Sequence, residues 1–237
     1  MIKIIFALLM VLLAAVVIAP FIFYFVVKNW QPSSSKINKD VNELRLGVQD
    51  DIDGLLPWDD DELELLSYDV VKQAKKRGLG TTFSGTITSI YQEPMVVYVG
   101  KKYMNMSKKP NGFIYAVTAH HDFFYRLRNN GVTLYIDEKE VGYLKSSGEL
   151  VSMDRKKLLA SVNTKSNELY APVTIGQKEI ANIRRPKGEV KTNERAFDHL
   201  KKDISKDEET LLLSLSIFEI LKIDILPAVV EKAAKTV

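Results

Sequence analysis

Residues 210–225 read TLLLSLSIFEILKIDI, a strongly apolar stretch that lies late in the sequence. From 211 to 226, eleven of sixteen residues are strongly apolar, and three charged residues interrupt them: Glu219, Lys222 and Asp224. Each charge near the centre of a bilayer costs roughly 2.5 to 3.5 kcal/mol, and a membrane-spanning helix needs about 17 or more apolar residues. We therefore expect a helix that does not cross a membrane.

The polar residues of this helix form one narrow row. Ser216, Glu219 and Lys222 are spaced three apart, so they share one face, while the other faces are apolar. A helix that is hydrophobic around most of its circumference is normally enclosed by protein. Ser205 and Glu208 form a capping box at its start. We expect the preceding part of the chain to supply the enclosure.

That preceding part has the period of β-strands. From Thr81 the hydrophobic period becomes two, in short β-branched and aromatic runs separated by Gly, Asn and Pro. The runs are TFSGTITSIY, MVVYV, FIYAVTA, VTLYI, EVGYL, VTI and EIANI. Two segments resemble each other, IDEKEVGYL at 136–144 and IGQKEIANI at 175–183. Their shared pattern predicts a repeated hairpin, and chance similarity between two hairpins is the alternative.

The sequence opens with an apolar segment in which the 24 residues Ile4 to Val27 carry no charge. A helix of this length rises about 1.5 Å per residue and spans a hydrocarbon core of about 30 Å. A cleaved signal peptide is the alternative, but its apolar core runs only about 7 to 15 residues, and here FIFYFVV continues after Ala19. We predict an uncleaved transmembrane anchor at 1–30.

The charges that flank this anchor predict its orientation. The α-amino group and Lys3 precede it, whereas Lys28, Lys36 and Lys39 follow it within reach of the bilayer. The positive-inside rule favours a cytoplasmic body by one charge. The expected location is the cell membrane, with a single span.

Residues 31–79 predict a polar and acidic linker with two helices. Apolar residues at helical spacing mark the first helix at 35–48. The second, at 59–78, has acids in its first turn, bases in its last turn and Gly78 as its stop. Helical period also returns at 193–204, before the C-terminal helix. The remaining domain, 80–237, is expected to be rich in β-strands.

These patterns together predict an α+β protein. An N-terminal transmembrane helix is followed by a mostly antiparallel β-barrel-like domain that encloses a hydrophobic C-terminal helix. This arrangement is economical because the strands and the apolar helix bury each other.

The two hairpins and the helix ETLLLSLSIFEILKIDI at 209–225 resemble the tubby C-terminal-like superfamily, which includes phospholipid scramblases and the LURP-one-related proteins. In that family the strands form a closed barrel threaded by the hydrophobic C-terminal helix. The resemblance covers about residues 80–226 and implies such a barrel here. The N-terminal anchor departs from the familiar members, and no phosphoinositide-binding motif transfers residue by residue. The resemblance therefore implies a fold and no particular activity.

The sequence offers little catalytic or metal-binding chemistry. It has no cysteine, which excludes disulfides, thiolate nucleophiles and cysteine zinc sites. QDDIDGLLPWDD at 49–60 lacks the first carboxylate and the final Glu of an EF-hand loop. His120 and His121 would point to opposite faces of a strand, so only His120 and Asp122 could share a metal. We expect no metal and no cofactor.

Three basic clusters interrupt the strand region and are the candidate lipid-binding sites. If they converge on one face beside a bilayer, each charge adds about 1 kcal/mol of attraction to anionic lipid. Ordinary solvated loops and helix ends are the alternative. The candidate residues are Lys75, Lys76, Arg77, Arg155, Lys156, Lys157, Arg184, Arg185 and Lys187.

These features favour a membrane-anchored, noncatalytic module that binds lipid headgroups or a partner protein. The first alternative is a structural subunit of a larger membrane complex, in which the acidic linker and the first helix dock. The second is a cryptic hydrolase that uses His120, Asp122 or His199. Nucleic acid is not an expected partner, because the charge is modest and aromatic residues do not interleave with it.

Overall fold

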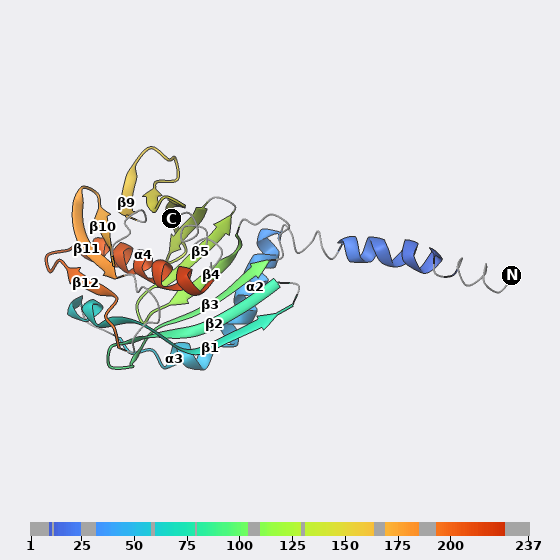
Figure 1. The fold of residues 1–237 in the computed structure, drawn as a ribbon, viewed down its shortest axis with the longest axis horizontal. Coiled ribbons are helices and arrows are strands. Elements are labelled where there is room, and N and C mark those ends of the chain that lie inside the picture. Colours follow the sequence, from blue (N-terminus) through green and yellow to red (C-terminus); the bar gives the residue numbers. More distant parts are fainter. Residues whose placement is uncertain are drawn as a thin grey trace.

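The computed structural model describes residues 10, 12–24, 32–57, 60–78, 80–103, 110–128, 131–163, 169–184 and 193–225. Within them, twelve strands form one antiparallel sheet whose spatial order follows the sequence (Figure 1). The strands are β1 (Leu66–Arg77), β2 (Gly80–Ser89), β3 (Pro94–Tyr103), β4 (Asn111–Val117), β5 (Asp122–Arg128), β6 (Gly131–Ile136), β7 (Lys139–Lys145), β8 (Glu149–Val151), β9 (Leu158–Val162), β10 (Tyr170–Ile175), β11 (Lys178–Arg184) and β12 (Phe197–Leu200). The helices are α2 (Ser34–Leu46), α3 (Gln49–Asp53), the 3₁₀ helix η1 (Asp60–Leu65) and α4 (Lys206–Ile225).

The sheet curls into a nearly closed barrel. The short segment 194–196 lies between β11 and β1: the Arg184 N–H donates to the Ala196 carbonyl over 2.8 Å, and the Ala196 N–H donates to the Leu66 carbonyl over 2.7 Å. The Tyr68 N–H completes this seam by donating to the Glu194 carbonyl over 3.1 Å. Near-closure satisfies backbone groups that an open edge would expose. The predicted antiparallel barrel is therefore confirmed.

Helix α4 is the core of this barrel. Ten consecutive residues, 212–221, are all buried. Because ten residues cover almost three helical turns, every face of the helix is enclosed. The Tyr125 hydroxyl on β5 donates to the Ser214 carbonyl over 2.7 Å, and its ring stacks on Phe218 with 5.5 Å between centroids. The expected buried C-terminal helix is confirmed, including its capping box, in which the Ser205 N–H donates to Glu208 over 2.9 Å.

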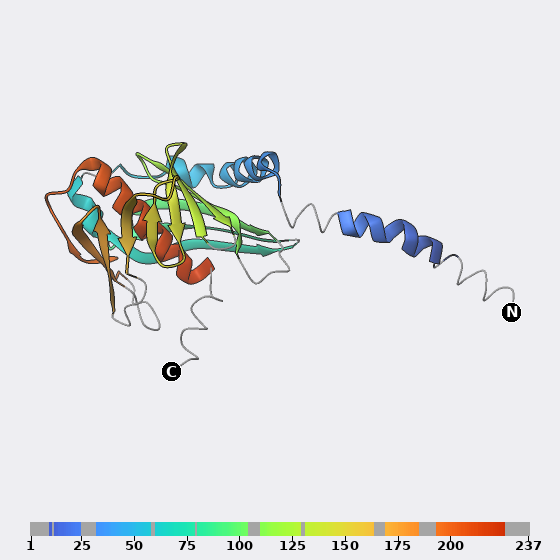
Figure 2. The same ribbon diagram turned by 90° about the horizontal axis from the view of Figure 1, so that it is seen from above.

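Helix α2 covers the opposite face of the sheet. Figure 2 shows α2 and α4 on the two sides of the strands around β3 and β4. The apolar stripe predicted in this helix packs against outward-facing side chains of β3, β4 and β5. Ile37 contacts Tyr103 and Phe113. Val41 and Leu44 continue the contact. The first predicted linker helix is therefore part of the folded body.

The two similar sequence segments form equivalent hairpins. In one, Ile136 pairs with Lys139 across a tight turn; in the other, Ile175 pairs with Lys178. Each hairpin has a register shift two residues before its turn, between Leu134 and Tyr135 in β6 and at the matching position in β10. A shared bulge at the shared sequence position favours a structural repeat over chance similarity.

The prediction of a second linker helix at 59–78 is wrong. Within the described residues 60–78, η1 alone is helical, and β1 follows it as a strand that pairs with β2 from Leu66↔Ser89 to Arg77↔Thr81. The charge pattern at the segment ends favoured a helix, but pairing with β2 satisfies the backbone and buries Leu66 completely. The sheet consequently begins at Leu66, ahead of residue 80.

The helical period at 193–204 also gave a wrong prediction. Phe197–Leu200 is strand β12, which pairs with β11 and buries Phe197. A short segment gains more from extending an existing sheet than from an isolated turn of helix, because helix nucleation is costly.

The N-terminal apolar segment is described in part. Residues 10 and 12–24 are helical, and their large apolar side chains are exposed, for example Phe21 and Phe23 at 70% each. The other residues of the predicted span, 4–9, 11 and 25–27, lie outside the described residues. Among the helices that the structure describes, none meets the length and hydropathy of a membrane span.

Phe218→Ala is expected to lower the free energy of unfolding by about 3 to 5 kcal/mol, because it opens a cavity between α4 and Tyr125. Urea unfolding of the purified full chain, followed by circular dichroism, measures the change. Leu46→Ala, at a side chain that is 74% exposed, is the control and should change stability by about 0.5 kcal/mol or less. Equal losses in both variants would show that α4 is not the core.

Candidate functional site

A buried carboxylate fixes α2 to the sheet. Asp40 is 6% exposed, accepts a hydrogen bond of 2.7 Å from the Tyr103 hydroxyl and forms an ion pair of 2.9 Å with Lys101. Burial and then the Asp40 contact raise the pKa of Tyr103 well above its ordinary value, so the phenol stays protonated and donates. The start of α2 is therefore held rigidly on the end of β3.

A basic hollow opens beside this attachment. It has a volume of about 720 Å³ and lies between the first turns of α2 and the end of the β1–β2 hairpin. Five basic and two acidic side chains line it, and Tyr24 of the N-terminal helical residues lines it as well. The basic residues are Lys36, Lys39, Lys76, Arg77 and Lys101, and the acidic ones are Asp40 and Glu43. The excess of cations suits an anionic ligand.

Two more lysines add positive charge to this end of the sheet. Burial and the nearby charge of Lys75 lower the pKa of Lys102. The shift reflects mainly the cost of burying the Lys102 ammonium, and to a smaller extent its repulsion by Lys75.

Among the described residues of the three predicted basic clusters, only those of the first line this hollow. Lys76 and Arg77 line it, and Lys75 precedes them in β1. Arg184 lies across the barrel seam near Leu66, at the opposite end of β1 from Arg77, and pairs with Glu194 at 3.5 Å.

The other predicted lipid-binding residues lie elsewhere. Arg155, Lys156 and Lys157 are exposed in the β8–β9 turn, at the opposite strand end from the β1–β2 turn. Arg185 and Lys187 lie outside the described residues. The described residues of the three clusters therefore do not form one continuous site.

Sequence reasoning missed Lys36, Lys39 and Lys101. Lys36 and Lys39 are three apart, a spacing that places them on one face of a helix, so this signal was present. Lys101 belongs to the site only because the sheet brings β3 beneath α2, which no local pattern indicates.

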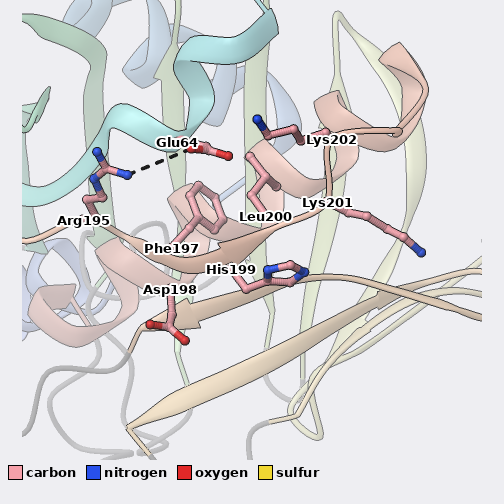
Figure 3. A pocket seen from close by; sticks show the side chains of 8 residues that line it. All are labelled: Glu64, Arg195, Phe197, Asp198, His199, Leu200, Lys201 and Lys202. Carbon is pink, nitrogen blue, oxygen red and sulfur yellow. Dashed lines mark ion pairs between the residues drawn. The ribbon is translucent and has the colours of Figure 1, made fainter.

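A second hollow, of about 390 Å³, surrounds β12 (Figure 3). Figure 3 shows Phe197 and Leu200 within it, Glu64 paired with Arg195 at 4.0 Å, and the Asp198 carboxylate directed away from the His199 ring. His199, which the sequence placed on a helix, is on an exposed strand. Of the two carboxylates drawn in Figure 3, that of Glu64 faces Arg195 and that of Asp198 points away, so neither forms a catalytic pair with the His199 ring.

The other two histidines lie in the turn between β4 and β5. The His121 Nδ1 is 2.8 Å from the Asp137 carboxylate, and its Nε2 is 3.3 Å from the Thr210 hydroxyl on α4. Thr210, His121 and Asp137 thus contact one another in the order hydroxyl, imidazole and carboxylate, as in a catalytic triad. However, the Thr210 hydroxyl also lies 2.9 Å from the Lys206 carbonyl and donates to it. The contact therefore ties the first turn of α4 to two hairpin turns.

The pair His120 and Asp122 does not form a site. The turn places His120 in solvent, whereas the Asp122 carboxylate accepts a hydrogen bond of 2.6 Å from the Tyr115 hydroxyl. Residues 118–121 form a turn and not the strand that we expected from the sequence. The argument that His120 and His121 point to opposite faces of a strand therefore does not apply. Within the described part of the chain, no group of three metal-ligating side chains comes together.

Comparison of the chain with protein-family models, with curated proteins and with solved structures finds no match. The resemblance to the tubby C-terminal-like superfamily stays a prediction from the sequence.

Asp40→Ala is expected to cost about 3 kcal/mol of unfolding free energy, because it leaves a half-buried ammonium and a phenol without their shared acceptor. Urea unfolding measures it. Glu43→Ala, which removes an exposed acid from the same helix, is the matched control and should change stability by about 0.5 kcal/mol or less. Similar losses would mean that Asp40 does not anchor α2.

Asp137→Asn is expected to cost less than about 1 kcal/mol, because the Asp137 side chain is 48% exposed. Partial burial raises the pKa of Asp137, but hydrogen bonds from Asp122 and His121 outweigh it and lower the pKa below 3.8. Because the pKa of Asp137 is lower in the folded than in the unfolded protein, its carboxylate stabilises the fold at pH values above 3.8. This stabilisation is lost as the pH falls through the pKa of the folded protein. The difference from wild type should therefore be seen at neutral pH and disappear once the pH falls below the folded pKa of Asp137, which lies below 3.8.

Thermal unfolding of both proteins across that range, with Glu138→Gln as a charge-matched control, measures the difference. A gap that persists unchanged at low pH would refute the contribution of the carboxylate.

Proposed function

We propose that the protein is a single-pass membrane-anchored, noncatalytic module that binds anionic lipid headgroups in the basic hollow between α2 and the β1–β2 hairpin. The anchor is the uncharged segment 4–27, with the body on the cytoplasmic side. The observation that carries the proposal is the convergence of five basic side chains and Tyr24 on one hollow.

The position of the hollow supports the proposal. Tyr24 belongs to the exposed apolar helical residues and also lines the hollow. Tyrosine is enriched at the membrane–water interface, where its ring meets the headgroups. With the segment inserted, the hollow would open at headgroup level, and an anionic phosphate would meet the Lys and Arg side chains there.

The attachment of α2 supports a defined orientation. The Asp40 contacts with Lys101 and Tyr103, together with the apolar packing of Ile37, hold the first turns of α2 on the sheet. A helix that is fixed at this point carries the hollow at a constant distance from the anchor. The barrel around a C-terminal helix is also the basis on which we propose a relation to the tubby C-terminal-like superfamily.

Lys76→Ala combined with Arg77→Ala is expected to weaken binding of dioctanoyl phosphatidylserine at least about tenfold, since each lost charge removes about 1 kcal/mol of attraction. Native mass spectrometry of the full chain in mild detergent measures binding, and dioctanoyl phosphatidylcholine is the uncharged comparison. Lys139→Ala with Lys178→Ala removes two exposed lysines from other turns and should leave binding unchanged.

Two outcomes would contradict the proposal. One is equal binding of the two lipids by the wild type. The other is phosphatidylserine binding by the Lys76 and Arg77 variant that matches the wild type while its thermal unfolding is unaltered.

A further inference from the structure

His121 connects three elements that are far apart in the sequence. Its backbone is fixed in the turn between β4 and β5, because its N–H donates to the Thr118 hydroxyl over 3.0 Å and its carbonyl accepts from the Thr118 N–H over 2.9 Å. From this position the ring reaches Asp137, in the β6–β7 turn, and Thr210, near the start of α4. The Asp122 N–H also donates to the Asp137 carboxylate, over 3.0 Å. The fold therefore holds the partners of the ring in place.

Both partners of the ring accept hydrogen bonds. The Asp137 carboxylate, 2.8 Å from Nδ1, can only accept when it is charged. The Thr210 hydroxyl, 3.3 Å from Nε2, has one hydrogen and donates it to the Lys206 carbonyl over 2.9 Å, so its lone pairs face the ring. Only a ring with a hydrogen on both nitrogens can donate to both partners. The contacts of the structure are therefore those of an imidazolium.

The charges on the three elements that meet at His121 also suit a cationic ring. Residues 118–122, 137–139 and 206–210 carry six acids and two lysines, together with His120, whose side chain is exposed. The acids are Asp122, Asp137, Glu138, Asp207, Glu208 and Glu209, and the lysines are Lys139 and Lys206. Carboxylates stabilise a nearby imidazolium and lysines do the opposite, so the balance of charge acts in the same direction as the two hydrogen bonds.

Loss of one proton from the ring changes the contact with α4. The remaining hydrogen stays on Nδ1, because the Asp137 carboxylate is a stronger acceptor than a hydroxyl. The Nε2 lone pair then faces the lone pairs of the Thr210 hydroxyl. Either this hydroxyl leaves the Lys206 carbonyl and donates to Nε2, or the contact between the ring and Thr210 opens. In both cases the start of α4 loses one of the hydrogen bonds that the structure shows.

We propose that Asp137, His121 and Thr210 form a pH-sensitive latch, in which the imidazolium holds the start of α4 against the β4–β5 and β6–β7 turns and the neutral ring weakens that hold. The latch stabilises the start of α4 while His121 is charged, and this stabilisation is lost as the pH rises through the range between about 5 and 8 in which histidine loses its proton. It makes the attachment of the core helix responsive to mild acid. The latch is independent of the proposed lipid binding, since none of its three residues lines the basic hollow.

Nitrogen-15 NMR of the full chain, labelled at histidine and kept in mild detergent, shows directly which imidazole nitrogens carry hydrogen. As the pH is raised, His121 should lose the hydrogen of Nε2 and keep that of Nδ1, and the exposed His120 is the reference in the same spectrum. A neutral His121 ring that carries its hydrogen on Nε2 would overturn the proposal. This measurement needs only the wild-type protein, so it does not depend on whether a variant folds.

Hydrogen exchange of the amides of residues 207–212, followed by mass spectrometry and corrected for the intrinsic effect of pH, measures the hold on α4. In wild type, protection at about pH 5.5 should exceed that at about pH 8 by about two- to tenfold, the effect of one hydrogen bond. Thr210→Val removes the acceptor and should abolish this difference, and His121→Gln should do the same. His120→Gln is the matched control and should keep it. Equal protection at both pH values in wild type, or an unchanged difference in Thr210→Val, would refute the latch.

Discussion

Enclosure of α4 is the constraint on which the rest of the structure depends. A helix with apolar side chains on nearly all faces has no stable place in water, and Glu219 and Lys222 make it costly in lipid. The curved sheet removes the helix from both environments. The two charged residues pair with each other at 3.1 Å, and the exposed fraction of the Lys222 side chain is 21%, so they lie at the margin of the core. The barrel thus shields the apolar side chains of α4 from both water and lipid.

Filling the barrel in this way restricts where a ligand can bind. Side chains of α4 and of the inner strand faces make one continuous core, so the inside of the barrel is occupied by the protein itself. Ligands must then use the outer faces and the turns. The basic hollow illustrates this, because it is built where α2 crosses the outside of the sheet beside the β1–β2 hairpin. The barrel is the support on which α2 and the hairpin ends are placed.

The charges on this surface serve two different purposes. Asp40, Lys101 and Tyr103 form a buried set whose polar atoms satisfy one another and hold α2 in place. The exposed side chains of Lys39, Lys76 and Arg77 line the hollow without belonging to this buried set. The same division applies at the β8–β9 turn, where Asp154 orders the backbone while Arg155, Lys156 and Lys157 face solvent.

The sequence alone determined the elements whose signal is local. The periods of two and of 3.6 predicted the antiparallel strands, α2 and α4, and the similarity of 136–144 to 175–183 predicted two equivalent hairpins. Tertiary structure decided the rest. Residues 66–77 became a strand and Phe197–Leu200 joined β11 because pairing with a neighbouring strand outweighs the helix propensity of a short segment. The basic hollow could not be predicted from the sequence, because Lys39, Lys76 and Lys101 come from separate elements that meet only when α2 packs on β3.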